Sequence, residues 1–374
     1  MRKILVIGQS DNPGGVEAVI KRYYEKVKKE IQFDLMVFTD ICYDEEYYKK
    51  NNCKVVYIKS AQFKHPYKYK KEIKRFFLKS KGIYDAIWYN SCDLANCGYI
   101  MKQAKKIGIN KRIVHAHNNE LMQTGKKRYF YEIMHQYWKN NIDRYATEFW
   151  ACSELAGRFF YKESILKSDK YKIINNAINV KKYCRNNEIR SRVRRELGIN
   201  EKEIVLGHVG RFQYQKNHDF LIDIYYLFHK NYPDSRLLLI GQGVEEKAIK
   251  NKVKKLNLEQ NVIFTGVRDD VDELFQAMNV FVLPSRFEGL GIVLVEAQAA
   301  GLPCVTSKDV VPDMVNITGN VEFVALDEPV EKWVSTIYRQ ANKKIDYVLS
   351  NNKISDAGFD IDIEAGKFKK YIEG

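Results

Sequence analysis

Glu288 and Glu296 are two carboxylates eight positions apart, with a glycine-rich turn over 289–291 between them. A carboxylate can accept hydrogen bonds from sugar hydroxyls. We expect a buried strand before the turn, at 280–283, and a helix after it, at 294–300. The first amide N–H groups of such a helix favour phosphate, because the helix dipole is positive there. The spacing alone fits an ordinary strand-to-helix turn with two solvated acids equally well.

Arg211 and Lys216 form a second polar set, just after another apolar run at 204–209. The Arg guanidinium is a planar fork of donors and the Lys ammonium is a compact charge, so both suit a diphosphate. A solvated basic loop is the alternative. We favour the diphosphate, because ligands of parallel sheets bind beyond the carboxyl ends of the strands.

Gly14 and Gly15 follow the first apolar run and open a helical pattern. Glycine allows the backbone to approach a phosphate closely. The pattern is not G-x-G-x-x-G, and no acidic residue plainly occupies the end of the second apolar run to hold a ribose. A dinucleotide site is therefore disfavoured, and an ordinary glycine turn remains the alternative.

His115 and His117 close an apolar run at 112–117, and strand alternation places both on one face. A zinc site is disfavoured, because no third ligand stands at a suitable spacing. We expect one histidine, His117, to reach a sugar hydroxyl from the strand end. The other is expected to pack in the core.

Two segments combine basic and aromatic residues, 62–81 and 125–131. In the first, Ile73, Phe76 and Phe77 can form a core-facing stripe while the cations cover the opposite face. The second is expected on a loop beside the histidines. Such segments dock on anionic membranes or bind RNA, and a plain solvated surface is the third possibility. The cations selected for contact with an acceptor or a membrane are Lys64, Lys68, Lys71, Arg75, Lys126, Lys127 and Arg128.

Short apolar runs alternate with helical patterns throughout the chain, which predicts an α/β fold with parallel sheets. In the first half we expect strands at 4–8, 33–39, 55–58, 86–90, 112–117 and 148–152. In the second half we expect them at 204–209, 236–240, 262–265, 280–283, 304–306 and 322–325. The polar stretch near 171–179 marks a boundary between two doubly wound domains, 1–176 and 177–355. A C-terminal helix, 356–374, is expected to pack back on the first domain, and the ligand is expected in a cleft between the domains.

The charge is confined to the first domain. Residues 1–176 hold 34 Lys and Arg against 19 Asp and Glu, a net charge of +15, while the remainder holds 28 of each sign. This imbalance favours an anionic partner for the first domain. No signal peptide or membrane-spanning run is evident, and the seven scattered cysteines predict reduced thiols in a cytoplasmic protein.

In combination, these motifs resemble the retaining, nucleotide-sugar-dependent glycosyltransferases of family 4, which have the GT-B fold of two Rossmann-like domains facing a central cleft. The bacterial capsule and exopolysaccharide enzymes are the most similar group. Glu288 and Glu296 match the family's E-x7-E signature. The other matches follow in family order at Gly14-Gly15, 114–118, 207–217, 264–267 and 296–303. One departure is at 315–320, where many members have an Asn-Gly turn.

The resemblance implies a role for each matching residue. Arg211 and Lys216 would bind the donor diphosphate, Glu296 the ribose, and the backbone near Val267 the base. Glu288 and the amides of 290–292 would position the sugar and phosphate. The full donor set is Gly14, Gly15, Arg211, Lys216, Val267, Glu288, Gly289, Leu290, Gly291, Ile292 and Glu296. The catalytic set is His117, Glu288, Arg211 and Lys216, with no metal ion and no cofactor apart from the UDP-sugar substrate.

The expected function is transfer of a hexose or N-acetylhexosamine from a UDP-sugar to a lipid-diphosphate-linked saccharide. This reaction belongs to capsular, exo- or lipopolysaccharide biosynthesis, on the inner face of the plasma membrane. A sugar-nucleotide epimerase on the same fold is the alternative, although an epimerase does not need a basic first domain. A phosphorylase would usually need a pyridoxal lysine and a longer chain. A nucleic-acid-binding protein would leave the two glutamates unexplained, so no nucleic-acid partner is expected.

Overall fold

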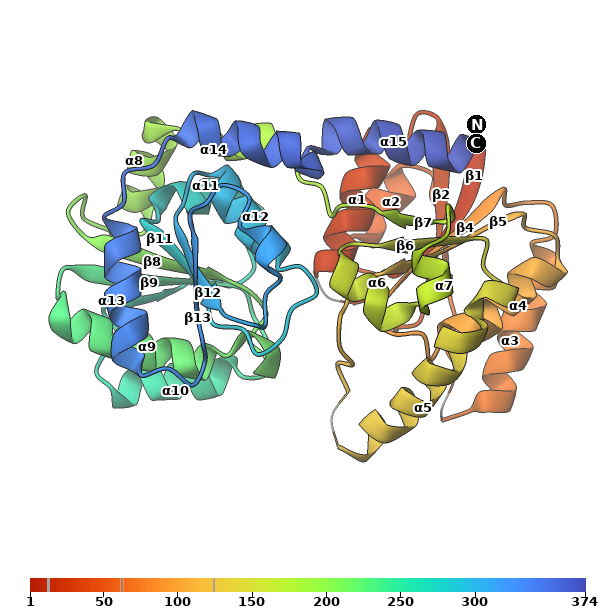
Figure 1. The fold of residues 1–374 in the computed structure, drawn as a ribbon, viewed down its shortest axis with the longest axis horizontal. Coiled ribbons are helices and arrows are strands. Elements are labelled where there is room, and N and C mark those ends of the chain that lie inside the picture. The colour runs from red at the N-terminus through yellow and green to blue at the C-terminus, as the bar shows by residue number, and fades with distance from the viewer. Residues whose placement is uncertain (12–13, 61, 63, 124) are drawn as a thin grey trace. The chain divides into compact units, whose positions relative to one another are not determined.

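The computed structural model describes residues 1–374 except 12–13, 61, 63 and 124, and the side chain of Lys126 is also outside the description. The described chain forms two compact units. Unit 1 comprises Met1–Ala177 together with Ile361–Gly374, and unit 2 comprises Ile178–Asp360. Each unit is an α/β structure built on one parallel sheet (Figure 1), so the predicted fold class is confirmed.

Unit 1 contains a seven-stranded sheet in the order β3-β2-β1-β4-β5-β6-β7. All of its ladders are parallel. The strands are β1 (Arg2–Ile7), β2 (Ile31–Val37), β3 (Val55–Tyr57), β4 (Ala86–Ser91), β5 (Lys111–Ala116), β6 (Glu148–Ala151) and β7 (Tyr171–Ile173). Strands β1, β2 and β4 are almost wholly buried, as expected for a parallel sheet covered on both faces.

The helices of unit 1 connect these strands. They are α1 (Gly15–Val27), α2 (Glu45–Lys50), α3 (Pro66–Lys79), α4 (Cys97–Lys106), α5 (Lys126–Asn141), η1 (Ile142–Arg144), α6 (Glu154–Phe160), α7 (Glu163–Leu166) and α15 (Ile361–Glu373). The last helix returns to this unit and packs on α1 (Figure 1). Its Phe368 ring lies 4.8 Å from the Trp88 ring and 5.1 Å from the Tyr23 ring, so α15 completes the core.

Unit 2 contains a six-stranded parallel sheet in the order β10-β9-β8-β11-β12-β13. The strands are β8 (Ile204–Val209), β9 (Ser235–Ile240), β10 (Val262–Phe264), β11 (Val280–Leu283), β12 (Cys304–Ser307) and β13 (Val321–Val324). All six lie within one or two residues of the expected runs. Short apolar runs bounded by Gly, Pro or Asn specify buried parallel strands well, since both faces of each strand are covered.

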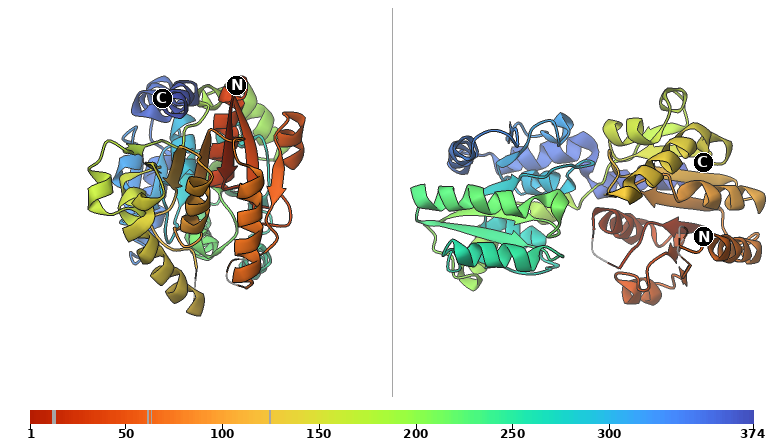
Figure 2. Two further views of the ribbon diagram at one scale, coloured as in Figure 1. Left: turned by 90° about the vertical axis from the view of Figure 1, so that its right-hand side faces the viewer. Right: turned by 90° about the horizontal axis from the view of Figure 1, so that it is seen from below.

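The helices of unit 2 flank its sheet (Figure 2). They are η2 (Val180–Tyr183), α8 (Asn187–Glu196), η3 (Tyr214–Lys216), α9 (His218–Asn231), α10 (Glu246–Lys255), α11 (Val271–Ala277), α12 (Ile292–Ala299), η4 (Asp313–Val315), α13 (Val330–Ala341), α14 (Tyr347–Ile354) and η5 (Ser355–Phe359). Within the described residues, no helix is both long enough and apolar enough to cross a bilayer.

The strand order reverses once in each unit. Chain connections run outward from β1 in one direction and from β4 in the other, and likewise from β8 and β11. Such reversal points leave a crevice beyond the carboxyl ends of the two central strands, where ligands of doubly wound sheets bind. The fold therefore indicates ligand binding at the loops after β8 and β11 in unit 2, and at the loops after β1 and β4 in unit 1.

Candidate active site

Lys216 and Glu288 come together at the reversal point of unit 2, although they are 72 residues apart in the chain. Lys216 ends the short helix after β8, and Glu288 lies on the loop between β11 and α12. The Lys216 ammonium lies 2.6 Å from Glu288 Oε1, and the Ser285 hydroxyl donates to the same oxygen at 2.7 Å. Because Glu288 is only 5% exposed, this is a buried, charge-assisted network at the edge of the sheet.

Backbone contacts hold the two loops together. The Arg286 amide donates to Gln215 O at 2.8 Å, and the Gln215 side chain donates to Phe287 O at 3.0 Å. The Arg286 guanidinium also lies over the Tyr214 ring, 4.2 Å from its centroid, and donates to Tyr214 O. These contacts join the loop that carries Lys216 to the loop that carries Glu288, and so position the two charged groups.

The helix α12 starts at the glycine-rich turn. Gly291 precedes its first residue with φ of +74°, a left-handed conformation that glycine adopts without strain. The next residues direct their amides toward the helix start, as a phosphate site requires. Glu296 is the fifth residue of α12 and is buried, as are all residues of this helix except the half-buried Ile292.

Arg211 and Val267 lie on two further loops at the same edge of the sheet. Arg211 is half-buried and follows Gly210, whose carbonyl oxygen packs directly against Gly241, leaving no room there for a side chain. Val267 is 41% exposed and follows Gly266, whose φ is +69°. The loops after β8, β9, β10 and β11 therefore all end at one edge of the sheet in unit 2.

Two neutral histidines lie behind Lys216. Burial lowers the pKa of His208 to about 4, so its ring is neutral. Its Nδ1 donates to Val282 O at 2.8 Å. His218 stacks on the Phe212 ring at 4.0 Å, and burial lowers its pKa to about 2. The two imidazole rings lie 4.6 Å apart, and neither carries a charge beside the Lys216 ammonium.

Three predicted residues of unit 1 lie beyond the carboxyl ends of its strands, after β1 and β5. Gly14 precedes α1 in an extended conformation, and Gly15 is its first residue, with open space where a side chain would lie. His117 follows β5 and is buried, and its Nε2 lies 2.9 Å from Asn90 Oδ1 at the end of β4. Burial lowers the pKa of His117 to about 3, so the ring is neutral. His115 is wholly buried in the core, as expected for one of the pair.

The basic residues selected in the segment 62–81 are exposed, with Lys64 just before α3 and the other three on it. Lys64, Lys68, Lys71 and Arg75 all face solvent, while Tyr69, Ile73 and Phe77 are buried. Of the expected stripe, Phe76 is only half-buried. The apolar face of this helix therefore serves the core, and its outer face is chiefly cationic.

The prediction of a loop at 125–131 is wrong, because α5 begins at Lys126. Gly125, with φ of +63°, precedes the helix and allows the chain to turn into it. Lys127 and Arg128 are exposed on its first turn, and Arg128 pairs with Glu120 at 2.7 Å. The side chain of Lys126 lies outside the described residues. The exposed apolar side chains of this helix are Tyr129, Phe130, Ile133 and Tyr137.

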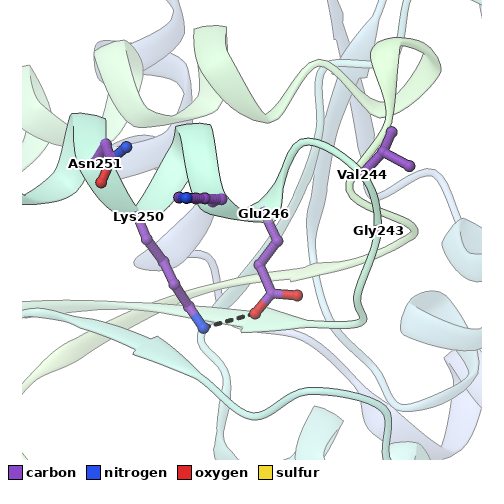
Figure 3. A pocket seen from close by; sticks show the side chains of 6 residues that line it. Gly243, Val244, Glu246, Lys250 and Asn251 are labelled. Carbon is purple, nitrogen blue, oxygen red and sulfur yellow. Dashed lines mark ion pairs between the residues drawn. The ribbon is translucent and has the colours of Figure 1, made fainter.

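A separate open hollow of about 470 Å³ lies on the outer side of α10 (Figure 3). It is lined by Gly243, Val244, Glu246, Lys247, Lys250 and Asn251. Glu246 and Lys250 pair across one turn of the helix at 2.6 Å. Since this pair satisfies both charges and none of the predicted site residues lines the hollow, we assign it no role in the reaction.

Two Asp-x-Asp triplets occur in the chain, at 270–272 and 360–362. Asp270 pairs with Arg268 at 2.6 Å, and Asp362 pairs with Lys26. Over the described part of the chain, no three His, Cys, Asp or Glu side chains are grouped as they would be around a metal ion.

Sequence reasoning missed Ser285 and Asn90, which bond to Glu288 and His117. A weak signal was available for both, because each stands at the carboxyl end of a central strand, where site residues gather. Their partners could not have been assigned without the strand order.

Comparison with known proteins identifies the family. Residues 189–357 match the family model of the glycosyl transferases group 1. The chain is 30% identical over 352 residues to the putative glycosyltransferase EpsF of Bacillus subtilis, covering 91% of this chain and 88% of that protein. It is also 27% identical over 230 residues to a galactosyltransferase of Escherichia coli named for UDP-Gal and α-D-GlcNAc-diphosphoundecaprenol, covering 57% and 56% of the two chains.

The fold is also found in solved structures. HepE of Anabaena, crystallised with UDP, superposes with a TM-score of 0.78 over the full length of both chains, at 19% identity. This likeness concerns the fold, in which two Rossmann-like domains each carry a parallel sheet. The chain therefore belongs to the group 1 glycosyltransferases, and its two parallel sheets form the GT-B fold.

Proposed function

We propose that this glycosyltransferase transfers a hexose or N-acetylhexosamine from a UDP-sugar to a lipid-diphosphate-linked saccharide, with retention at the anomeric carbon. The observation that carries the proposal is the buried Lys216–Glu288–Ser285 network at the reversal point of unit 2, next to the glycine-led start of α12. It combines a cation, an anion and free helix amides, as a sugar diphosphate requires. The names of the E. coli and Anabaena proteins support UDP and a lipid-diphosphate acceptor.

Within this proposal, unit 2 holds the donor. Arg211 and Lys216 bind the diphosphate, with the amides at 290–292 completing its coordination. Glu288 accepts hydrogen bonds from the sugar, and Glu296 accepts them from the ribose. Before the donor binds, Glu288 neutralises Lys216 at 2.6 Å, so the cation is held in place for the incoming phosphate.

The transfer then needs no protein nucleophile. The acceptor hydroxyl forms a bond to the anomeric carbon on the face from which the diphosphate departs, and its proton passes to the departing phosphate oxygen. Arg211 and Lys216 stabilise the charge that builds on the diphosphate, and such preorganised electrostatic stabilisation is usually the largest single contribution to catalysis. Neutral His117 and the Gly14-Gly15 turn of unit 1 contact the donor in this scheme, and no metal ion takes part.

Unit 1 is proposed to face an anionic membrane on the cytoplasmic side, where the acceptor lipid resides. The outer face of α3 supplies cations, and α5 supplies exposed apolar side chains, of which Tyr129 is 74% exposed. These two helices flank α4: α3 packs on it directly, and the Trp138 ring of α5 covers Gly98 of α4. Basic and aromatic residues together bind the headgroup region of anionic bilayers.

Nucleotide binding is tested by thermal unfolding with UDP. At 100 times Kd the ligand contributes about 2.7 kcal/mol, which should raise the Tm of a unit of this size by about 5–10 °C. Glu296→Ala should abolish the shift. Glu331→Ala, at an exposed position of α13 in the same unit, is the matched control and should retain it. Absence of a shift with every uridine nucleotide would refute the donor assignment.

Transfer is tested by screening UDP-sugars for UDP release with and without a lipid-diphosphate-saccharide. Release that depends on the acceptor, with an α-linked product from an α-linked donor, supports the proposal. Interconversion of UDP-sugars without an acceptor would instead identify an epimerase.

Membrane docking is tested by co-sedimentation with vesicles of phosphatidylglycerol or of phosphatidylcholine alone. Binding to the first should weaken with salt, and Tyr129→Ser with Phe130→Ser should reduce it. Tyr226→Ser, at a tyrosine of unit 2 that is 43% exposed, is the control. Equal binding of the wild-type protein to both lipids, or tight salt-sensitive binding to RNA in place of vesicles, would contradict the docking proposal.

A further inference from the structure

Asn90 contacts both β1 and the ring of His117 through its side-chain amide. It is the fifth residue of β4 and is 3% exposed. Its Nδ2 lies 3.2 Å from Ile7 O, and its Oδ1 lies 2.9 Å from His117 Nε2. The side chain thus bridges β1 and the end of β5, across the point where the strand order of unit 1 reverses.

The hydrogen-bond roles in this bridge follow from chemistry. A backbone carbonyl can only accept, so the Asn90 amide nitrogen must face Ile7, and its oxygen must face His117. The oxygen in turn can only accept, so His117 Nε2 must carry the proton. A neutral imidazole has one N–H, and therefore Nδ1 of His117 is left with a lone pair.

The lone pair on Nδ1 has no donor among the described residues. The atom is buried, and the whole side chain is 7% exposed. Buried polar atoms of native proteins are nearly always paired. A hydroxyl group of a bound molecule is the kind of donor that this atom lacks.

The surrounding residues preserve this arrangement. At Gly8, where φ is +136°, an added Cβ would lie 2.7 Å from Asn90 Cβ, so a side chain there would displace the amide. The neighbouring pair repeats the pattern: Trp88 Nε1 donates to His115 Nδ1 at 3.3 Å. Trp88 and Asn90, alternate residues of β4, thus contact His115 in β5 and His117 just after it, and the two imidazole rings lie 4.1 Å apart.

We propose that Asn90 is a positioning residue for sugar transfer: it holds His117 in the Nε2–H form so that Nδ1 accepts a hydrogen bond from a substrate hydroxyl. This inference rests on the proposed function, since it needs His117 beside the sugar. It assigns the ring a neutral accepting role and excludes a role as an acid or a cation.

The experiment compares three variants of the full chain. Asn90→Leu removes the accepting oxygen and keeps a similar side-chain volume. If this variant does not fold, Asn90→Ser is used in its place, because the serine side chain is too short to reach the ring. Asn90→Asp keeps an oxygen opposite Nε2. We expect the first change to lower kcat about 10–100-fold with little change in the donor KM, and Asn90→Asp to restore kcat to within about 3-fold. In a His117→Gln background, Asn90→Leu should have less than a 2-fold further effect.

The tautomer itself is read by ¹⁵N NMR of histidine-labelled protein, with His117 assigned from the His117→Gln spectrum. The wild type should show a protonated Nε2 and an unprotonated Nδ1, and Asn90→Leu should lose this preference. An unchanged tautomer in that variant, or an equal loss of kcat in Asn90→Asp, would overturn the proposal. A wild type without any transferase activity would refute the proposed function and the catalytic half of this inference, while the NMR result would still decide whether Asn90 sets the tautomer.

Discussion

Replacing Glu288 by Gln tests how much the buried Lys216–Glu288 ion pair contributes to the stability of unit 2. The change keeps the volume of the side chain and an oxygen for the Ser285 hydroxyl. It removes the negative charge that lies 2.6 Å from the Lys216 ammonium. Lys216 is then left with a buried, uncompensated charge, because its side chain is only 15% exposed.

The size of the effect follows from burial. Breaking a fully buried pair by removing one partner costs about 3–5 kcal/mol, and the residual exposure of Lys216 reduces this to about 3 kcal/mol. Lys216→Met should cost a similar amount. The double variant leaves no unpaired charge, so it should cost about 3 kcal/mol instead of the additive value of about 6 kcal/mol, which is a coupling energy of about 3 kcal/mol.

The assay must report on unit 2 alone, and tryptophan provides the probe. Trp333 is the only one of the four tryptophans within residues 178–360, and it is buried on α13. In protein labelled with 5-fluorotryptophan, its ¹⁹F signal follows the unfolding of this unit in urea. The reasoning would be refuted if the free-energy losses of the two single variants simply added in the double variant. A loss in the free energy of unfolding below about 0.5 kcal/mol for Glu288→Gln would refute it as well.

Three further outcomes are expected. Burial lowers the pKa of His208 to about 4 and that of His218 to about 2, whereas histidine in the unfolded chain has a pKa of about 6.5. Both histidines therefore take up protons more readily in the unfolded chain, so the free energy of unfolding of unit 2 should fall as the pH falls below about 6.5. The loss at pH 5.5 should be about 1 kcal/mol per histidine in urea titrations, and His218→Phe should reduce it. Gly291→Ala should cost about 1–2 kcal/mol by the ¹⁹F assay, because φ is +74° there, and should weaken UDP binding in the thermal-shift measurement. Incubation with EDTA should leave the rate of UDP release unchanged, and a loss restored by Mg²⁺ or Mn²⁺ would contradict the metal-free scheme.

Local sequence patterns were sufficient for the elements. The run 280–283 is β11 without adjustment, and Ser153 precedes α6 with its hydroxyl accepting from the Ala156 amide. These features depend on a few neighbouring residues, so a single sequence specifies them. The expectation of a helix after the glycine turn was also confirmed, with α12 starting two residues earlier than predicted.

The surface of unit 1 was less accessible to such reasoning. Phe77 is buried on the inner face of α3, as expected for the core-facing stripe, but Tyr69, which the expected stripe did not include, is buried as well. Tyr129 and Phe130, on the first turns of α5, are exposed. Which of two amphipathic segments faces the core depends on neighbouring helices, and this information is absent from either segment alone.

The sequence by itself determined the two parallel sheets, the loops at the carboxyl ends of their strands and the residue types available there. Only the tertiary structure decided which of those residues meet. Lys216 reaches Glu288 because β8 pairs with β11, and Asn90 reaches His117 because β4 pairs with β5. Strand order is set by packing over the whole sheet, so no local pattern could have disclosed either contact.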